Sequence, residues 1–203
     1  MIKAVLFDYG GVLSPGGRTS VSQEVLGKLL DVPTEKIQIG DLDAQLGRGE
    51  INREQFFDLV GRQYQGKAAE ADYVALADIF QRNETVYQLA ILLRQNQIKT
   101  GIVANVATIN AQLLREHGFY NGFDPVVLSC ESGVRKPDQS IYKLALNLIG
   151  EIAAHVVYID DQPANIIPAK ELGMRAILAN SPGQVIADIT KLVKADNGLE
   201  LAV

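Results

Sequence analysis

The sequence predicts an α/β fold in which a parallel β-sheet carries helices on both faces and a helical segment is inserted after the first strand. Short apolar runs bounded by turn residues alternate with helical patterns, as is typical of buried parallel strands. The first two runs, which end at Phe7 and begin at Thr100, lie more than ninety residues apart. Later runs start about one strand–helix unit apart, so the long first gap indicates an insertion.

The predicted strands are brief and consist mainly of β-branched and other apolar residues. They cover residues 4–7, 100–103, 125–128, 156–159 and, with a weaker pattern, 175–178. Helical patterns follow the second, third and fourth strands, over residues 108–117, 138–149 and 163–172. Gly150 is expected to end the second of these helices in a left-handed conformation, and Pro163 to begin the third.

The inserted segment is also predicted to be helical. Apolar residues recur at helical spacing within residues 20–30, 52–60 and 72–80. Asn52 and Asp72 are plausible N-caps for the second and third of these helices.

This organisation predicts two domains. A further helix is expected over residues 83–94, where the chain returns to the sheet. We therefore assign residues 1–14 and 83–203 to a core domain and residues 15–82 to the inserted helical domain. The Pro-Gly-Gly sequence of residues 15–17 is expected to form a flexible connection between them.

Composition and charge argue against several function classes. Nineteen basic and twenty-four acidic residues give a net charge of −5, which argues against a nucleic-acid partner or an anionic membrane surface. The single cysteine, Cys130, excludes an internal disulfide and a cysteine-based zinc site. Apolar runs are far shorter than the roughly 18–20 residues that span a bilayer, and the N-terminal sequence lacks a signal-peptide pattern. We expect a globular cytoplasmic protein without a membrane partner.

Polar or glycine residues follow four of the predicted strands. They are Asp8, Gly10 and Gly11 after the first strand, Asn105 after the second, Lys136 in the loop past the third, and Asp160, Asp161 and then Asn165 after the fourth. In an open parallel sheet, ligands bind beyond the carboxyl ends of the strands, so these residues are expected to converge. Each alone has an ordinary explanation as an N-cap, a turn or a solvated lysine. Their occurrence at consecutive strand ends favours a shared site.

The types of these residues indicate chemistry that involves a cation. Three carboxylates at one point repel one another and stay ionised together only near positive charge. Oxygen ligands of this kind suit a hard divalent ion, most simply Mg²⁺, and Lys136 supplies a second counter-charge. The sequence therefore predicts a Mg²⁺ site beside a lysine at the edge of the sheet.

The sequence also resembles the haloacid dehalogenase (HAD) superfamily, in the subgroup that carries a helical cap after the first strand. The resemblance runs through residues 5–13, 133–142 and 156–166 and covers essentially the whole chain. It implies that the sheet is Rossmann-like and that residues 15–82 are the helical cap domain. Phosphatases are the commonest members, so the resemblance implies a small phosphorylated molecule as the substrate.

The resemblance further implies roles for the residues at the strand ends. Asp8 would be the nucleophile that attacks phosphorus and forms an aspartyl-phosphate. Lys136 would bridge this nucleophile and a phosphoryl oxygen. Asn105, Gly10 and Gly11 would face the substrate.

The resemblance also implies which groups of this chain would hold the metal. Mg²⁺ would be held by the carboxylates of Asp8, Asp160 and Asp161 and by the backbone carbonyl of Gly10. The cation would offset the repulsion between the attacking carboxylate and a phosphate dianion.

Two positions depart from the family pattern. Gly10 stands where the family usually has a second aspartate, which serves phosphatases as general acid for the leaving group and as base for the hydrolytic water. Ala104 stands where a serine or threonine usually binds the phosphoryl group. The first departure argues against a phosphomutase. Both weaken catalytic assistance while they leave the nucleophile and the metal site in place.

Three functions remain compatible with the sequence. The leading one is a Mg²⁺-dependent phosphatase that hydrolyses a small phosphorylated metabolite through an aspartyl-phosphate. The alternative, suggested by Gly10 and Ala104, is a catalytically impaired binding protein on the same scaffold. A 2-haloacid dehalogenase needs no metal and so fits Asp160 and Asp161 less well. Within the predicted cap, Arg48 could reach a substrate anion, although an exposed surface arginine explains it more simply.

Overall fold

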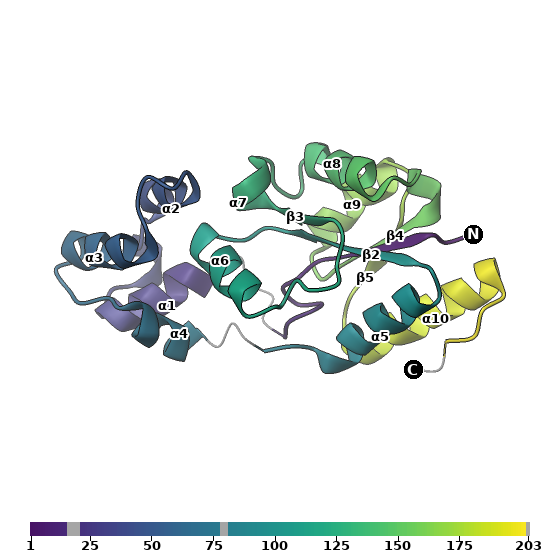
Figure 1. The fold of residues 1–203 in the computed structure, drawn as a ribbon, viewed down its shortest axis with the longest axis horizontal. Coiled ribbons are helices and arrows are strands. Elements are labelled where there is room, and N and C mark those ends of the chain that lie inside the picture. The colour runs from purple at the N-terminus through teal and green to yellow at the C-terminus, as the bar shows by residue number, and fades with distance from the viewer. Residues whose placement is uncertain (16–20, 78–80, 202–203) are drawn as a thin grey trace. The chain divides into compact units, whose positions relative to one another are not determined.

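The computed structural model of the chain describes residues 1–15, 21–77 and 81–201 (Figure 1). The predicted connection at residues 16–17 and the ends of two helical patterns, at residues 20 and 78–80, lie outside the described residues. Contacts between residues divide the chain into two units. The first unit consists of Met1–Gly17, Gln81–Asn105 and Tyr120–Val203, and the second of Arg18–Phe80 and Val106–Phe119.

The first unit is built on a sheet of five parallel strands in the order β3-β2-β1-β4-β5. The strands are β1 (Ala4–Phe7), β2 (Lys99–Ala104), β3 (Val126–Leu128), β4 (Val156–Asp160) and β5 (Arg175–Leu178). Each predicted strand is confirmed to within one residue at either end. The central strand, β1, is buried along its whole length, as expected for a strand that is covered on both faces.

Helices cover both faces of this sheet, as predicted. Figure 1 shows α8 (Gln139–Ile149) and α9 (Pro163–Glu171) on one face and α5 (Glu84–Gln95) and α10 (Pro182–Asn197) on the other. A short helix, α7 (Ser129–Ser132), follows β3 directly, and η2 (Ala153–His155) precedes β4. The predicted α/β class with a Rossmann-like sheet is therefore confirmed.

Helix α8 illustrates how local sequence sets these elements. Asp138 is its N-cap and accepts a hydrogen bond from the Ser140 backbone N–H (2.8 Å). Gly150 ends the helix with a φ of 68°, in the left-handed conformation predicted for it. Ile141 and Tyr142 on the inner face join a buried cluster with residues of β1, β4 and α9. Each such side chain contributes about 1.5–3 kcal/mol by burial.

The register of the sheet brings the ends of β1 and β4 level with each other. Phe7 pairs with Ile102 of β2 and with Ile159 of β4. The backbone N–H of Asp8 donates a hydrogen bond to the carbonyl of Ile159 (2.8 Å). Asp8 and Asp160 therefore leave the sheet at neighbouring positions.

The second unit is helical. Its helices are α1 (Val21–Leu30), η1 (Thr34–Lys36), α2 (Gly40–Gly47), α3 (Arg53–Gln63), α4 (Glu70–Ala77) and α6 (Thr108–Glu116). Asn52 caps α3 as predicted, through reciprocal hydrogen bonds of 2.9 Å with Gln55. The N-cap prediction for Asp72 is wrong, because α4 begins at Glu70 and Asp72 lies in its first turn. That residues 15–82 act as a cap stays a prediction.

Helix α6 groups with the second unit, whereas it was predicted to belong to the core domain. Asp43 of α2 accepts hydrogen bonds from the backbone N–H groups of Thr108 (3.1 Å) and Ile109 (3.4 Å). It thereby caps a helix whose own N-cap residue, Ala107, carries no polar side chain. Tyr73 of α4 donates a further buried hydrogen bond to α6 (2.6 Å). Among the described helices of both units, none is long and apolar enough to cross a membrane.

Candidate active site

Asp8 lies at the carboxyl end of β1, and only 7% of its surface is exposed. Its Oδ1 atom accepts a hydrogen bond from the Tyr9 backbone N–H (2.6 Å) and lies 2.7 Å from Nζ of Lys136. Because both contacts act on the same oxygen, they fix the orientation of the carboxylate. The predicted nucleophile and the predicted lysine are thus in direct contact.

Lys136 is a buried cation that neighbouring residues hold both at its ammonium group and at its backbone. Its Nζ atom lies 2.7 Å from Asp8 Oδ1 and 2.7 Å from Asp160 Oδ2. Asn105 fixes the backbone of Lys136, since its Nδ2 donates to the Lys136 carbonyl and its Oδ1 accepts from the Lys136 N–H, each at 2.9 Å. Asn105 is expected to face the substrate, and in the structure its amide holds the backbone of Lys136 in place.

Asp160, at the end of β4, is completely buried and surrounded by hydrogen-bond donors. Its Oδ1 accepts from the Gln162 backbone N–H (2.8 Å) and from Asn165 Nδ2 (3.0 Å). Its Oδ2 accepts from Lys136 Nζ (2.7 Å), from the Tyr158 hydroxyl and from Asn165 Nδ2 (3.1 Å). A carboxylate offers about four lone-pair sites, so the protein itself satisfies this group.

Asp161 is half-buried and differs from its neighbour in having an open environment. Its Oδ2 accepts a hydrogen bond from Gln162 Nε2 (3.0 Å). It lies against Gly11, which has a φ of 75°, and a Cβ at that position would come within 2.4 Å of Asp161 Oδ2. Gly11 is therefore required for this close approach, both by its backbone conformation and by the space it leaves.

The three carboxylates meet at one point, as predicted. One oxygen each of Asp8, Asp160 and Asp161 lies within 4.8 Å of the others. Burial raises the pKa of Asp8 to about 7, with Lys136 opposing the rise and Asp160 adding to it. Burial also raises the pKa of Asp161. The ionised cluster is short of positive charge, and its hard oxygen donors fit a divalent cation such as Mg²⁺.

Tyr158 and Asn165 are part of this site, although no role was predicted for either of them. Tyr158 lies two residues before Asp160 on β4, so the two side chains share one face of the strand. Burial holds the pKa of Tyr158 well above its usual value, which keeps the hydroxyl protonated as a donor. A tyrosine in an otherwise aliphatic strand, next to the aspartates, was the signal that could have identified it.

The two departures from the family pattern lie beside these residues. Gly10 forms a short bridge with Ser14 in the turn that follows β1, and the Ser14 N–H donates to the Tyr9 carbonyl (2.8 Å). Ala104 is buried at the end of β2, the strand next to β1. Neither position supplies a side-chain donor or proton carrier.

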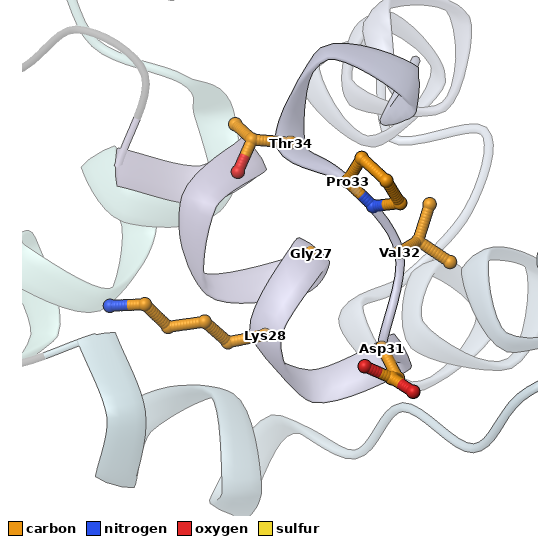
Figure 2. A pocket seen from close by; sticks show the side chains of 6 residues that line it. All are labelled: Gly27, Lys28, Asp31, Val32, Pro33 and Thr34. Atoms are coloured by element: carbon orange, nitrogen blue, oxygen red, sulfur yellow. The ribbon is translucent and has the colours of Figure 1, made fainter.

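The second unit contains a surface pocket of about 410 Å³. Gly27, Lys28, Asp31, Val32, Pro33 and Thr34 line it (Figure 2). The Lys28 and Asp31 side chains point away from each other, so they do not converge on a ligand. Arg48 in this unit is paired with Glu50 at 2.6 Å on the surface, in keeping with its simpler explanation as a surface arginine.

Similarity to known proteins identifies the class of protein that this fold and this acidic site define. The family model for haloacid dehalogenase-like hydrolases matches residues 2–173. The chain therefore belongs to this family, and the resemblance found in its motifs is confirmed.

Relatives and solved structures agree with this assignment. A sesquiterpene phosphatase from Aspergillus oryzae is 28% identical over 85% of this chain and 87% of its own length. A drimenol cyclase from Aspergillus calidoustus is 25% identical over 98% of this chain, which spans only 38% of that protein. A HAD family enzyme from Bacteroides thetaiotaomicron, solved with magnesium and inorganic phosphate, has a TM-score of 0.68 and 23% identity over 89% of this chain and 96% of its own. This last likeness concerns the fold.

Proposed function

We propose that the protein is a Mg²⁺-dependent phosphatase that hydrolyses a small phosphorylated metabolite through an aspartyl-phosphate on Asp8. The observation that carries this proposal is the contact of 2.7 Å between Asp8 and Lys136 within a cluster of three carboxylates. A buried ammonium beside a carboxylate at the carboxyl end of a central strand suits attack on a dianion. The phosphatase named among the relatives supports the same reaction class.

Asp8 Oδ2 is the oxygen that we expect to attack phosphorus, because two donors hold Oδ1. A bond forms between this oxygen and phosphorus as the ester P–O bond breaks, and the leaving oxygen takes its proton from water. Water then attacks the phosphorus of the aspartyl-phosphate, releases inorganic phosphate and restores Asp8. Lys136 Nζ has a third proton for a phosphoryl oxygen while it contacts Asp8 and Asp160.

Asp8, the Gly10 carbonyl and Asp161 are the groups that we propose hold Mg²⁺. When bound, the ion would offset the repulsion between the carboxylates and the phosphate dianion. Asp160 was expected to join this ligand set. Because its oxygens already accept hydrogen bonds from the protein, we propose that it instead holds Lys136 in place.

A catalytically impaired binding protein is the second candidate function. Gly10 and Ala104 favour it, since both positions lack the side chains that assist phosphoryl transfer elsewhere in the family. A 2-haloacid dehalogenase is disfavoured, because a reaction without a metal has no use for the half-buried carboxylate of Asp161.

Phosphate release from p-nitrophenyl phosphate and from a panel of phosphorylated metabolites tests the proposal. Activity that requires Mg²⁺, disappears with a chelator and is absent in Asp8→Asn would support it. Halide release from 2-chloropropionate without Mg²⁺ would instead support a dehalogenase. Mg²⁺ binding without either activity would support the impaired scaffold.

A further inference from the structure

The hydroxyl of Tyr158 reaches the same carboxylate oxygen that holds the Lys136 ammonium. Tyr158 is completely buried on β4 and donates its hydroxyl hydrogen bond to Asp160 Oδ2. Lys136 Nζ lies 2.7 Å from that oxygen and 5.9 Å from the centre of the Tyr158 ring. The ring of Tyr142 packs edge-on against that of Tyr158 at 5.2 Å, which holds the tyrosine in one place.

We propose that Tyr158 is a positioning residue for Lys136, which it orients through Asp160. This inference rests on the proposed phosphatase function for its catalytic consequence. The hydroxyl sets the rotation of the Asp160 carboxylate together with the Gln162 N–H and the Asn165 amide, because it fixes Oδ2 from the side of the strand. The hydroxyl also offsets part of the negative charge on Asp160 Oδ2, so Asp160 attracts the Lys136 ammonium less strongly.

The position of Lys136 between the carboxylates of Asp8 and Asp160 explains why the hydroxyl of Tyr158 matters. Lys136 Nζ lies 2.7 Å from both Asp8 and Asp160, and the ammonium must serve the phosphoryl group as well. Without the hydroxyl, Oδ2 of Asp160 keeps more of its charge and attracts Lys136 more strongly. The ammonium then moves toward Asp160 and away from Asp8. A buried hydroxyl is costly unless it is hydrogen-bonded, so its presence in this strand fits a specific partner.

The Tyr158→Phe variant removes this hydroxyl and keeps the ring that packs against Tyr142. We expect kcat for p-nitrophenyl phosphate to fall by about tenfold, at the lower end of the roughly 10–100-fold losses that follow removal of groups behind metal ligands. KM and the Mg²⁺ dissociation constant should stay within about twofold, because the hydroxyl of Tyr158 bonds to Asp160, which is neither the attacking group nor one of the proposed Mg²⁺ ligands. Tyr73→Phe is the matched control, since it removes an equally buried hydroxyl whose hydrogen bond goes to Asn110 in the second unit. Its kcat should equal that of the wild type.

A double-mutant cycle with Asp160→Asn separates positioning from a general loss of packing. If Tyr158 acts through Asp160, Tyr158→Phe should lower kcat by less than about twofold in the Asp160→Asn background. Effects of the two variants that multiply would overturn the proposal, as would an unchanged kcat in Tyr158→Phe itself.

Crystal structures of the wild type and of Tyr158→Phe test the inference without reference to turnover. We expect the Asp160 carboxylate to rotate and the contact between Lys136 Nζ and Asp8 Oδ1 to lengthen beyond hydrogen-bond distance. A lysine that keeps both contacts would overturn the inference. A wild type without phosphatase activity would overturn the proposed function alone, because these distances would still decide the role of Tyr158.

Discussion

Gly10 and Ala104 are the residues at which this site departs from the usual pattern of its family. A general acid typically contributes 10²–10⁴-fold to a rate, and one oxyanion donor about 10²–10³-fold. The site retains the buried contact between Asp8 and Lys136 but has neither of these aids at the two positions. Its chemistry should therefore depend strongly on how easily the leaving group departs.

We expect p-nitrophenyl phosphate to be hydrolysed much faster than simple primary alkyl phosphates. Acid assistance matters most when the leaving alkoxide is very basic, so the rate should depend steeply on the pKa of the leaving group. Gly10→Asp combined with Ala104→Ser should speed alkyl phosphates selectively and flatten this dependence. Steady-state kinetics on a series of leaving groups measures the slope, and equal rates for both substrate types would contradict the prediction.

The pKa of Asp8 predicts a pH dependence of metal binding. Burial raises that pKa to about 7, and a carboxylate must lose its proton before it can ligate a cation. The Mg²⁺ dissociation constant should therefore be constant above about pH 8 and rise by up to about tenfold per pH unit below 7. Calorimetry at several pH values should also detect release of a proton on binding at pH 6. An affinity independent of pH between 5 and 8 would contradict this prediction.

The positions of site residues could be predicted from sequence, but their contacts could not. Asp8, Lys136 and Asp160 follow strands, so the topology alone brings them to one edge. That Tyr158 donates to Asp160, and that Asn105 holds the Lys136 backbone, depends on side-chain rotation and loop path. Neither is encoded in apolar periodicity.

At the scale of elements, local sequence patterns identified some helices and not others. The helix predicted over residues 138–149 is bounded by Asp138 and Gly150 as expected. Helix α10 was missed, although Val185 and Ile189 recur at helical spacing after a Ser-Pro start that caps it. Helix α6 was found, but its grouping with the second unit rests on tertiary contacts that no local pattern shows.

Asp43 should contribute to stability through its hydrogen bonds to the first turn of α6. Asp43→Ala removes acceptors from two backbone N–H groups, at 3.1 and 3.4 Å, and should cost about 0.5–2 kcal/mol in the free energy of unfolding. Urea denaturation measures this loss. Asp41→Ala is the control, because it removes the same charge from an exposed position on α2 and should change stability by less than about 0.5 kcal/mol. Equal losses would contradict the capping role.

At the scale of the whole molecule, the charge of the site couples metal binding to stability. Three carboxylates against one lysine leave the cluster short of positive charge, so a divalent cation should favour the folded state. At 100 times the dissociation constant, a ligand that binds only the native state adds about 2.7 kcal/mol. For a chain of 203 residues this corresponds to a rise in Tm of roughly 5–10 °C.

Thermal melts with and without Mg²⁺ measure this rise directly. Asp161→Asn should remove most of it, whereas Asp58→Asn, on the exposed surface of α3, should retain it in full. A wild-type Tm that does not change at millimolar Mg²⁺ would count against a formed metal site.

The central claim, that Asp8 becomes phosphorylated, is tested most directly by the first turnover of p-nitrophenyl phosphate in a stopped-flow experiment with Mg²⁺. A good leaving group makes formation of the aspartyl-phosphate fast, and Gly10 provides no base for the water that must then release phosphate. We predict a burst of p-nitrophenolate close to one equivalent per protein molecule, followed by a slower steady rate, and no burst in Asp8→Asn. Linear release from the first turnover, or a burst that persists in Asp8→Asn, would contradict the account.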